Sequence, residues 1–428
     1  MVGFNNEGYD NPILKREGIN MEYKIMIDLM DIIKRRAGAI KIKKGMLKDL
    51  LMSYSLDYIT RTLDLVDEDT AKDKIDYAVF RKDTWTPEEA AKIKEYTLRD
   101  IEITKKLYEW VEDYFAGFKE FVNDEDARKK KYLTVSIAKF SYKAICKALK
   151  WPETYAQWGD DVDDSESIAG GYVAFPAGGE FHSGEKGDLY ALDFASLYPH
   201  VMIQCNLFGR KKEGEYNDRP TWSGGGHWEV EGQYYTDEMS GVSLLLKQWY
   251  YSRMFYKRKF LAVEDNIVYK MKDIKNFVNK EIYVVNHGVV EKKLVDDKLV
   301  EEYEHFNSNG VDRREYTIKI IMNTIYGILN TAYYTLVYDK VAGGDCTRLG
   351  RQWTRYARKI FREKGYKVIY TDTDSVYILD PFKDKKRMLA VREEIMAHIK
   401  STVPFPQPTF DLAIENEIKH MFFFKGKQ

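Results

Sequence analysis

Three aspartates in two short strings are the residues of this chain best suited to chemistry. Asp193 opens the string D-F-A-S-L-Y-P, and Asp372 and Asp374 belong to the string Y-T-D-T-D-S. Carboxylates brought within ~4 Å of one another repel by about 4 kcal/mol near a protein surface, so such a group persists only around a cation. Oxygen ligands without His or Cys suit Mg²⁺, which also binds substrate phosphates. The aspartates therefore predict a magnesium site that handles nucleotide phosphates.

A second group of polar residues lies between these strings, in K-x-x-x-N-x-x-Y-G. On a helix, Lys319, Asn323 and Tyr326 stand at i, i+4 and i+7, so they share one face and can meet one ligand. Their ammonium, amide and ring suit a nucleoside triphosphate, although without the aspartates they would be unremarkable on an exposed helix. Arg253 and Lys257, also four residues apart, form a cationic pair that can balance a triphosphate.

The three strings, in this order, resemble the signature motifs of the family B DNA polymerases: D-x-x-S-L-Y-P, K-x-x-x-N-S-x-Y-G and Y-x-D-T-D-S. The resemblance, closest to viral or phage members, implies nucleotidyl transfer from a dNTP to a DNA primer with two Mg²⁺ ions, for which Mn²⁺ can substitute. It makes Asp193 and Asp374 the principal metal ligands and Asp372 a nearby carboxylate. It places Tyr198 beneath the sugar, where the ring excludes a 2′-hydroxyl. The residues expected to bind the dNTP are Ser196, Leu197, Tyr198, Arg253, Lys257, Lys319, Asn323, Tyr326 and Gly327.

The first hundred residues resemble part of the family's 3′–5′ exonuclease. F-N-N-E-G-Y-D, which ends at Asp10, resembles the second exonuclease motif, and Tyr96 with Asp100 resembles the third. A proofreading nuclease also needs a D-x-E motif on an upstream strand, and only nine residues precede Asp10. We therefore expect an exonuclease remnant that does not proofread by itself.

Two further segments are expected to contact DNA by the same resemblance. Gly170 and Gly171 match the G-G motif between nuclease and palm. Lys425 and Lys427 lie in a segment that resembles the approach to the family's K-K-x-Y motif. The thumb, which follows that motif, is expected to be absent. The sequence thus predicts either a fragment or one piece of a split enzyme completed by another polypeptide chain.

Composition sets broad limits. At 428 residues and 44% hydrophobic, the chain can bury large cores in two or three domains. Its 67 basic and 68 acidic residues nearly cancel, so net charge does not indicate a nucleic-acid partner. Cys146, Cys205 and Cys346 lie far apart, which predicts buried free thiols in a reducing compartment. No long apolar run or leader is present, so we expect no membrane contact and a cytoplasmic location, the host-cell cytoplasm if the protein is viral.

The apolar patterns predict the elements that position these residues. Helical spacing covers 20–65 and 88–118, and a buried strand leads into Asp193. Helices are expected over 242–262, 312–332 and from near Asp345 to Gly365, and two strands joined by a tight turn carry Asp372 and Asp374.

With the resemblance, the expected fold is a multidomain α+β or α/β chain. A partial RNase H-like exonuclease domain precedes an antiparallel-sheet palm with helical-hairpin fingers. The expected domains are 1–118 (partial exonuclease), 119–171 (connecting segment), 172–241 (first part of the palm), 242–335 (fingers) and 336–428 (second part of the palm).

The interpretation that follows is the catalytic core of a template-directed DNA polymerase, with primer-template DNA and dNTPs as its partners. A non-catalytic DNA-binding or assembly subunit of a split polymerase is the alternative from another class. Asp193, Asp372, Asp374 and Lys319 favour the enzyme, because a subunit kept for assembly alone does not need them. Reverse transcriptase is a weaker enzyme alternative, because its paired aspartates are adjacent, whereas Thr373 separates them here.

Overall fold

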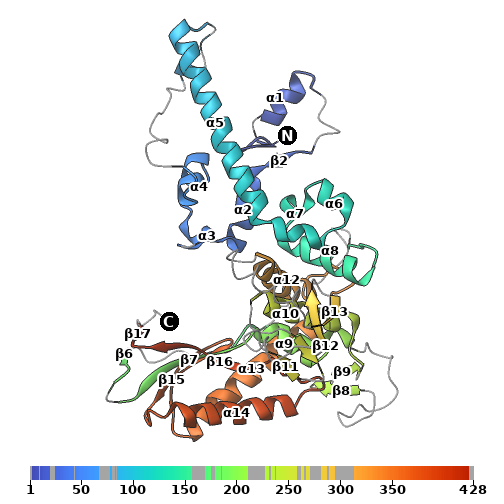
Figure 1. Cartoon of the computed structure of the whole chain (residues 1–428), viewed down its shortest axis with the longest axis vertical. Coiled ribbons are helices and arrows are strands. Elements are labelled where there is room, and N and C mark those ends of the chain that lie inside the picture. Colours follow the sequence, from blue (N-terminus) through green and yellow to red (C-terminus); the bar gives the residue numbers. More distant parts are fainter. Residues whose placement is uncertain are drawn as a thin grey trace. The chain divides into compact units, whose positions relative to one another are not determined.

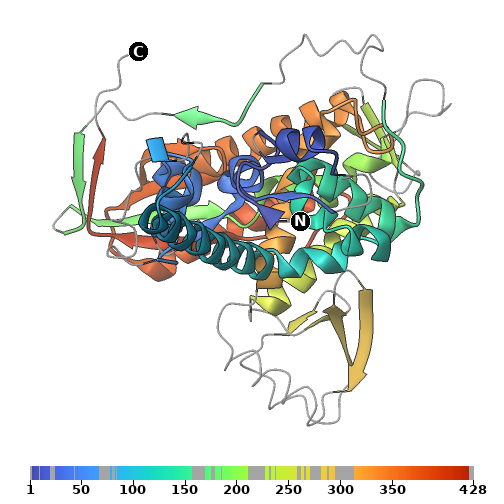
Figure 2. The same ribbon diagram turned by 90° about the horizontal axis from the view of Figure 1, so that it is seen from above.

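A computed structural model provides the structure, shown in two views in Figures 1 and 2. It describes residues 2–8, 10–19, 25–42, 44–66, 78–79, 82, 84–156, 169–174, 179–184, 186–210, 227–230, 233–236, 238–257, 262–264, 267–269, 281–286, 289–294 and 313–423. The chain divides into two compact units, Met1–Lys147 and Ala148–Gln428, and each is described by itself.

The first unit is built mainly from helices, with very short strands between them. Its helices are α1 (Asp10–Arg16), α2 (Leu29–Arg36), α3 (Leu47–Leu50), α4 (Leu56–Thr62), α5 (Pro87–Tyr114), α6 (Asp124–Arg128), α7 (Lys131–Thr134) and α8 (Ile137–Leu149), with 3-10 turns η1 (Ala37–Ala39) and η3 (Ala116–Phe121). Its strands are β1 (Val2–Gly3), β2 (Ile27–Asp28), β3 (Lys41–Ile42) and β4 (Gly45–Met46). The helical spacing over 20–65 therefore corresponds to three short helices rather than one long helix.

Helix α5 begins where the sequence predicts. The Thr86 hydroxyl accepts a hydrogen bond from the Glu89 backbone N–H at 3.2 Å, and the Glu89 carboxylate accepts one from the Thr86 N–H at 3.0 Å. This reciprocal capping box, followed by Pro87, satisfies donors that the first helical turn leaves free. Ile103, Leu107 and Val111 form the buried side of the helix.

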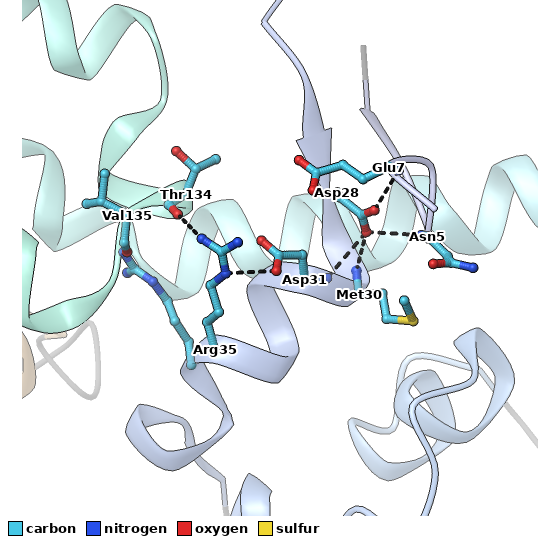
Figure 3. A network of polar contacts seen from close by, with 9 residues as sticks. Asn5, Glu7, Asp28, Met30, Asp31, Arg35, Thr134 and Val135 are labelled. Atoms are coloured by element: carbon cyan, nitrogen blue, oxygen red, sulfur yellow. Dashed lines mark hydrogen bonds and ion pairs between the residues drawn. The ribbon is translucent and has the colours of Figure 1, made fainter. Parts of the chain in front are cut away.

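A single carboxylate organises the start of the first unit (Figure 3). Asp28 accepts hydrogen bonds from the backbone N–H groups of Asn5 and Glu7, both at 3.0 Å. It also caps α2 by accepting from Met30 at 3.0 Å and Asp31 at 3.3 Å. Asp28 therefore fixes the loop before Asp10, a role that the sequence motifs did not indicate.

The second unit contains the sheet that positions the three aspartates. Its strands are β5 (Val173–Ala174), β6 (Gly179–His182), β7 (Asp188–Phe194), β8 (His227–Val230), β9 (Gln233–Thr236), β10 (Ala262–Glu264), β11 (Ile267–Tyr269), β12 (Glu281–Asn286), β13 (Val289–Leu294), β14 (Lys367–Asp372), β15 (Ser375–Asp380), β16 (Leu412–Ile418) and β17 (His420–Phe423). Its helices are α9 (Leu197–Gln204), α10 (Gly241–Tyr256), α12 (Arg313–Leu329), α13 (Lys340–Glu363) and α14 (Lys385–Ser401), with a 3-10 turn η4 (Leu207–Gly209).

The main sheet has five strands in the order β16-β7-β15-β14-β5, and every pairing is antiparallel. Helix α13 packs on β14 and β15, and α14 packs on α13 (Figure 1). The sheet residues Leu192, Val376 and Ile378 are fully buried, and Trp353 of α13 contacts the Phe410 ring at 5.2 Å between centroids. The antiparallel palm-like sheet predicted from the sequence is present.

Both expected helices, α10 and α12, are present and pack against each other, but the segment between them contains strands that were not expected from the sequence. Helix α10 ends at Tyr256 instead of continuing to 262, and the antiparallel pairs β10–β11 and β12–β13 follow it. Figure 2 shows β12–β13, in gold, as a ribbon of its own. The runs Ile282–Val285 and Val289–Val290 are rich in β-branched residues, which explains why these stretches pair as strands.

Two further expectations concern the whole chain. The three cysteines are free and buried, as predicted. None of the helices in the described part of the chain is long and apolar enough to cross a membrane. Lys425 and Lys427, which were expected to contact DNA, lie outside the described residues.

Candidate active site

The strand register brings the carboxylates to one end of the sheet. Ser375 is the direct partner of Asp193 on β7 and of Asp372 on β14. Directly opposed residues in antiparallel strands point to the same face, so Asp193, Ser375 and Asp372 share a face. The Ser375 hydroxyl donates to Asp193 Oδ1 at 2.9 Å. Asp374 lies in the turn between β14 and β15, and its carbonyl accepts from the Phe194 N–H at 2.9 Å.

The turn that carries Asp374 is held from two sides. Thr373 adopts a left-handed conformation with φ of 46°, and its N–H donates to the Tyr172 carbonyl at 2.8 Å. The buried Thr354 hydroxyl of α13 donates to the Thr373 carbonyl at 2.7 Å. A Cβ at Gly171 would lie 2.8 Å from Thr373 Cγ2, so this position has no room for a side chain. Gly171, predicted to contact DNA, therefore has a packing role against the aspartate turn.

Gly170 is in a different environment from Gly171. A Cβ at Gly170 would meet nothing within 4 Å. Its carbonyl accepts from Arg351 of α13 at 2.8 Å, and the same guanidinium also donates to the Ala169 carbonyl at 2.6 Å. The G-G segment is thus tied to α13 as well as to the aspartate turn.

The aspartates carry the electrostatic strain expected of a cation site. Burial, and then the charge of Asp374, raise the pKa of Asp193 to about 6. Burial also raises the pKa of Asp374, with the Asp372 and Glu415 charges adding to the effect. The Lys319 charge acts in the opposite direction on Asp193. A divalent cation would relieve this repulsion directly.

Glu415 is a fourth carboxylate that the sequence motifs did not single out. It lies on β16 where the pairing with β7 shifts register between Ile414 and Asn416, close to Ala413, the partner of Asp193. Its charge raises the pKa of both Asp193 and Asp374. A β-bulge redirects a side chain, which brings Glu415 under the influence of this site.

The donor set fits a hard cation, although the three aspartates do not close around one point. Among the described residues, the one group of three metal-ligating side chains whose ligand atoms lie within 4.8 Å of one another is elsewhere, on β6 and β17. Asp372 instead accepts hydrogen bonds from the Tyr370 hydroxyl at 2.9 Å and the Thr373 hydroxyl at 3.1 Å. Asp374 lies near both other aspartates, because its charge raises the pKa of Asp193 and the Asp372 charge raises the pKa of Asp374.

The two tyrosines expected at the nucleotide meet each other. Tyr198 of α9 and Tyr326 of α12 have ring centroids 5.0 Å apart at 32°. A Cβ at Gly350 of α13 would lie 3.2 Å from the Tyr198 ring, so the helix approaches the ring closely. On α12, Asn323 and Gly327 are exposed and Lys319 is half-buried. The structure therefore brings together the aromatic residues of two predicted motifs.

Arg253 of α10 is buried and hydrogen-bonded to α12 and to the turn after β7. Its guanidinium donates to Glu315 at 2.8 Å and to the Ser196 hydroxyl at 2.9 Å, and it is 7% exposed. Ser196 precedes α9 with φ of 53°, and Leu197 is buried. Arg253 therefore links α10 and α12 to the turn after β7, whereas Lys257, beyond the end of α10, is exposed.

The residues of the expected exonuclease remnant lie in the first unit. Asp10 begins α1, whereas Tyr96 and Asp100 lie one turn apart on α5. Burial raises the pKa of Asp100, and a hydrogen bond from Tyr96 opposes the rise. The tripeptide Asp100-Ile101-Glu102 has the D-x-E pattern but lies on a helix, whereas the exonuclease motif belongs on a strand.

Comparison with known proteins gives one consistent result. The sequence profile of DNA polymerase family B matches residues 283–428. A DNA polymerase of Pyrococcus glycovorans is 28% identical over 244 residues, which cover 56% of this chain and 25% of that protein. DNA polymerase 1 of Pyrococcus abyssi (strain GE5 / Orsay) is 23% identical over 423 residues, which cover 94% of this chain and 48% of that protein.

A solved structure is similar over the whole chain. The family B DNA polymerase of the hyperthermophilic archaeon Pyrobaculum calidifontis matches with a TM-score of 0.55 and 16% identity, covering 100% of this chain and 49% of that one. The chain thus spans at most about half the length of the relatives described here. Together with the three motifs in their order, these matches show that the chain is similar to the family B DNA polymerases.

Proposed function

We propose that this chain carries out template-directed DNA synthesis, joining a dNTP to the 3′-hydroxyl of a DNA primer. The observation that carries the proposal is the placement of Asp193 and Asp374 at one end of the sheet, where burial raises the pKa of both carboxyl groups and the Asp374 charge adds to the rise at Asp193. Similarity to the family B DNA polymerases supports the same reaction.

Asp193 and Asp374 are the residues that would hold divalent cations, with Asp372 and Glu415 nearby. Carboxylate oxygens suit Mg²⁺, with Mn²⁺ as a substitute, and the proposed site takes two ions. Bound ions would supply positive charge at the attacking and leaving oxygens of the transfer. Ser375 holds the Asp193 carboxylate, and the contacts of Thr354 and Tyr172 with Thr373 hold the turn that carries Asp374. Both carboxylates are thereby positioned to orient such ions.

The nucleotide is proposed to lie between α9, α10 and α12. Lys319 is assigned to its phosphates, and Asn323, Tyr326 and Gly327 to the nucleotide and the new base pair. The backbone at Ser196 and Leu197 is assigned to the phosphates, because turns before helices bind anions. Tyr198 is assigned to the sugar, and its close contact with Tyr326 supports a rigid ring at that position.

Two cationic residues complete the proposed nucleotide site. Lys257 is exposed, and Arg253 has to leave Glu315 and Ser196 before it can reach a triphosphate. We propose that such an exchange accompanies nucleotide binding, with the phosphates replacing the Glu315 carboxylate.

Primer extension tests this proposal. The chain is incubated with a primer-template, dNTPs and Mg²⁺ at low salt, because phosphate contacts weaken steeply as salt rises. We expect extension by the parent chain and none by Asp193→Asn or Asp374→Asn. Glu363→Gln, an exposed residue of the same unit, removes one negative charge as a matched control and should extend normally. Equal extension by Asp374→Asn would overturn the assignment, and no extension by the parent would favour a non-catalytic role.

A further inference from the structure

A short ribbon in the second unit carries a group of polar residues that the proposed reaction does not use. Strands β6 and β17 pair antiparallel, with His182 opposite His420 and Phe181 opposite Met421. Figures 1 and 2 both show the two strands side by side. The ribbon continues the β7–β16 pairing of the main sheet, and the Ser183 N–H donates to the Lys419 carbonyl at 2.9 Å where the two join.

The two faces of the ribbon are chemically different. On one face the Phe181 and Phe423 rings lie 6.2 Å apart, and Phe423 contacts Tyr370 of the main sheet at 5.2 Å between centroids. Alternation along a strand places Glu180 and His182 on the opposite face, and the register adds His420 to them. The apolar face is therefore partly covered by the sheet, while the opposite face presents a carboxylate, two imidazoles and the exposed Phe422 ring.

These three side chains converge. Nδ1 of His182 lies 2.6 Å from Nδ1 of His420, and Nε2 of His182 lies 3.2 Å from Oε1 of Glu180. The ligand atoms of all three residues lie within 4.8 Å of one another. The side chains of His182 and Glu180 are 48% and 49% exposed, so an ion can reach them from solvent. Two imidazole nitrogens this close have to share either a proton or a cation.

We propose that Glu180, His182 and His420 bind a divalent transition-metal ion of the Zn²⁺ class. Two imidazoles and one carboxylate match the ligands of this class, whereas Mg²⁺ prefers an all-oxygen site. Three protein ligands leave one position of a tetrahedral ion open for water. The site thus differs in chemistry from the aspartate site, whose all-oxygen ligands suit Mg²⁺.

The ion would join β6 to β17. The ligands come from both strands, so metal binding would stabilise their pairing and hold the apolar face of the ribbon on Tyr370. Tyr370 in turn donates a hydrogen bond to Asp372. The proposed ion therefore supports a surface that adjoins the aspartate site without contacting substrate.

A metal titration of the full chain tests the proposal. The chain is titrated with Zn²⁺ in a buffer that contains a large excess of Mg²⁺ to occupy the aspartates, and binding is followed by calorimetry. A second titration, with Co²⁺ in place of Zn²⁺, follows binding by the visible absorption of the Co²⁺ complex. We expect a single equivalent to bind and the affinity to fall at least about tenfold in His182→Ala and in His420→Ala. His398→Ala removes an exposed histidine of α14 that stacks on Tyr356, and it should bind like the parent.

Two further readouts keep the test decisive. Glu180→Gln preserves side-chain size and should also weaken Zn²⁺ binding even if a histidine variant loosens the ribbon. Zn²⁺ should slow hydrogen exchange of the β6 and β17 amides in the parent and not in His420→Ala. The proposal is overturned if the parent binds no Zn²⁺, if the ligand variants bind it as the parent does, or if His398→Ala loses it equally. The titration uses neither DNA nor dNTP, so its outcome is independent of the proposed polymerase activity.

Discussion

Replacing Asp193 with Asn should stabilise the chain when no divalent cation is present. The pKa of Asp193 rises from 3.8 to about 6 in the folded chain, because burial and the Asp374 charge disfavour the carboxylate. The folded state therefore holds this proton more tightly than the unfolded state does. Stability consequently falls as pH rises from about 4 to about 6, and the ionised side chain remains destabilising at neutral pH. Asn removes the charge and can still accept the hydrogen bond from Ser375.

The size of the effect follows from the pKa difference. The change from 3.8 to about 6 corresponds to about 3 kcal/mol. Asp193 is only partly buried, so solvent screening reduces this value to about 1 to 1.5 kcal/mol. For a unit of this size, such a difference raises the melting temperature by about 2 to 5 °C.

Thermal unfolding with a chelator and with millimolar Mg²⁺ measures the prediction. In chelator at neutral pH, Asp193→Asn should melt above the parent, and near pH 4 the difference should vanish. Mg²⁺ should raise the melting temperature of the parent, because it binds the folded site, and should raise that of the variant much less. Glu363→Gln should behave like the parent in both solutions. A variant that melts below the parent in chelator, or that gains equally from Mg²⁺, would refute the proposed electrostatic strain.

Substitutions at three further places test the surroundings of the site. Gly171→Ala should lower primer-extension activity, because the added Cβ would collide with Thr373. Gly170→Ala is the control and should extend normally, because a Cβ at this position meets open space. The double variant with Gly171→Ala and Thr373→Gly should recover part of the activity. Thr354→Val should lower the free energy of unfolding by about 1 to 3 kcal/mol in denaturant titrations, because the Thr373 carbonyl loses its donor, and a variant as stable as the parent would contradict this. Tyr198→Ala should raise ribonucleotide incorporation relative to deoxynucleotide at least about tenfold in single-nucleotide assays, and an unchanged ratio would remove Tyr198 from sugar selection.

Apolar patterns in the neighbouring sequence predicted the strand before Asp193 and the hairpin that carries Asp372 and Asp374. The apolar run before Asp193 indicated a buried strand, and the structure places Asp193 near the end of β7. The alternating residues around Asp372 and Asp374 indicated a hairpin, and β14 and β15 form it with Asp374 in the turn. In both cases neighbouring residues determine the conformation, so the sequence was sufficient.

The sequence motifs did not indicate the residues that approach the site through contacts between segments far apart in the chain. Glu415 acts on Asp193 because β16 pairs with the far side of β7 and is bulged there, and nothing in its immediate sequence indicates that pairing. Likewise, nothing in the neighbouring sequence indicates that Gly171 packs against Thr373, which is distant in sequence. Helix α13 begins at Lys340, before the predicted start near Asp345, because the Asp339 side chain caps it there.

Single-nucleotide addition tests the central claim most directly. The parent chain and Asp374→Asn are each given Mg²⁺ and one dNTP at a time, on four primer-templates that differ in the templating base. We predict that the parent adds the complementary nucleotide on each template and that Asp374→Asn adds none. Addition that ignores the templating base, or that continues in Asp374→Asn, would contradict a template-directed polymerase site at Asp193 and Asp374.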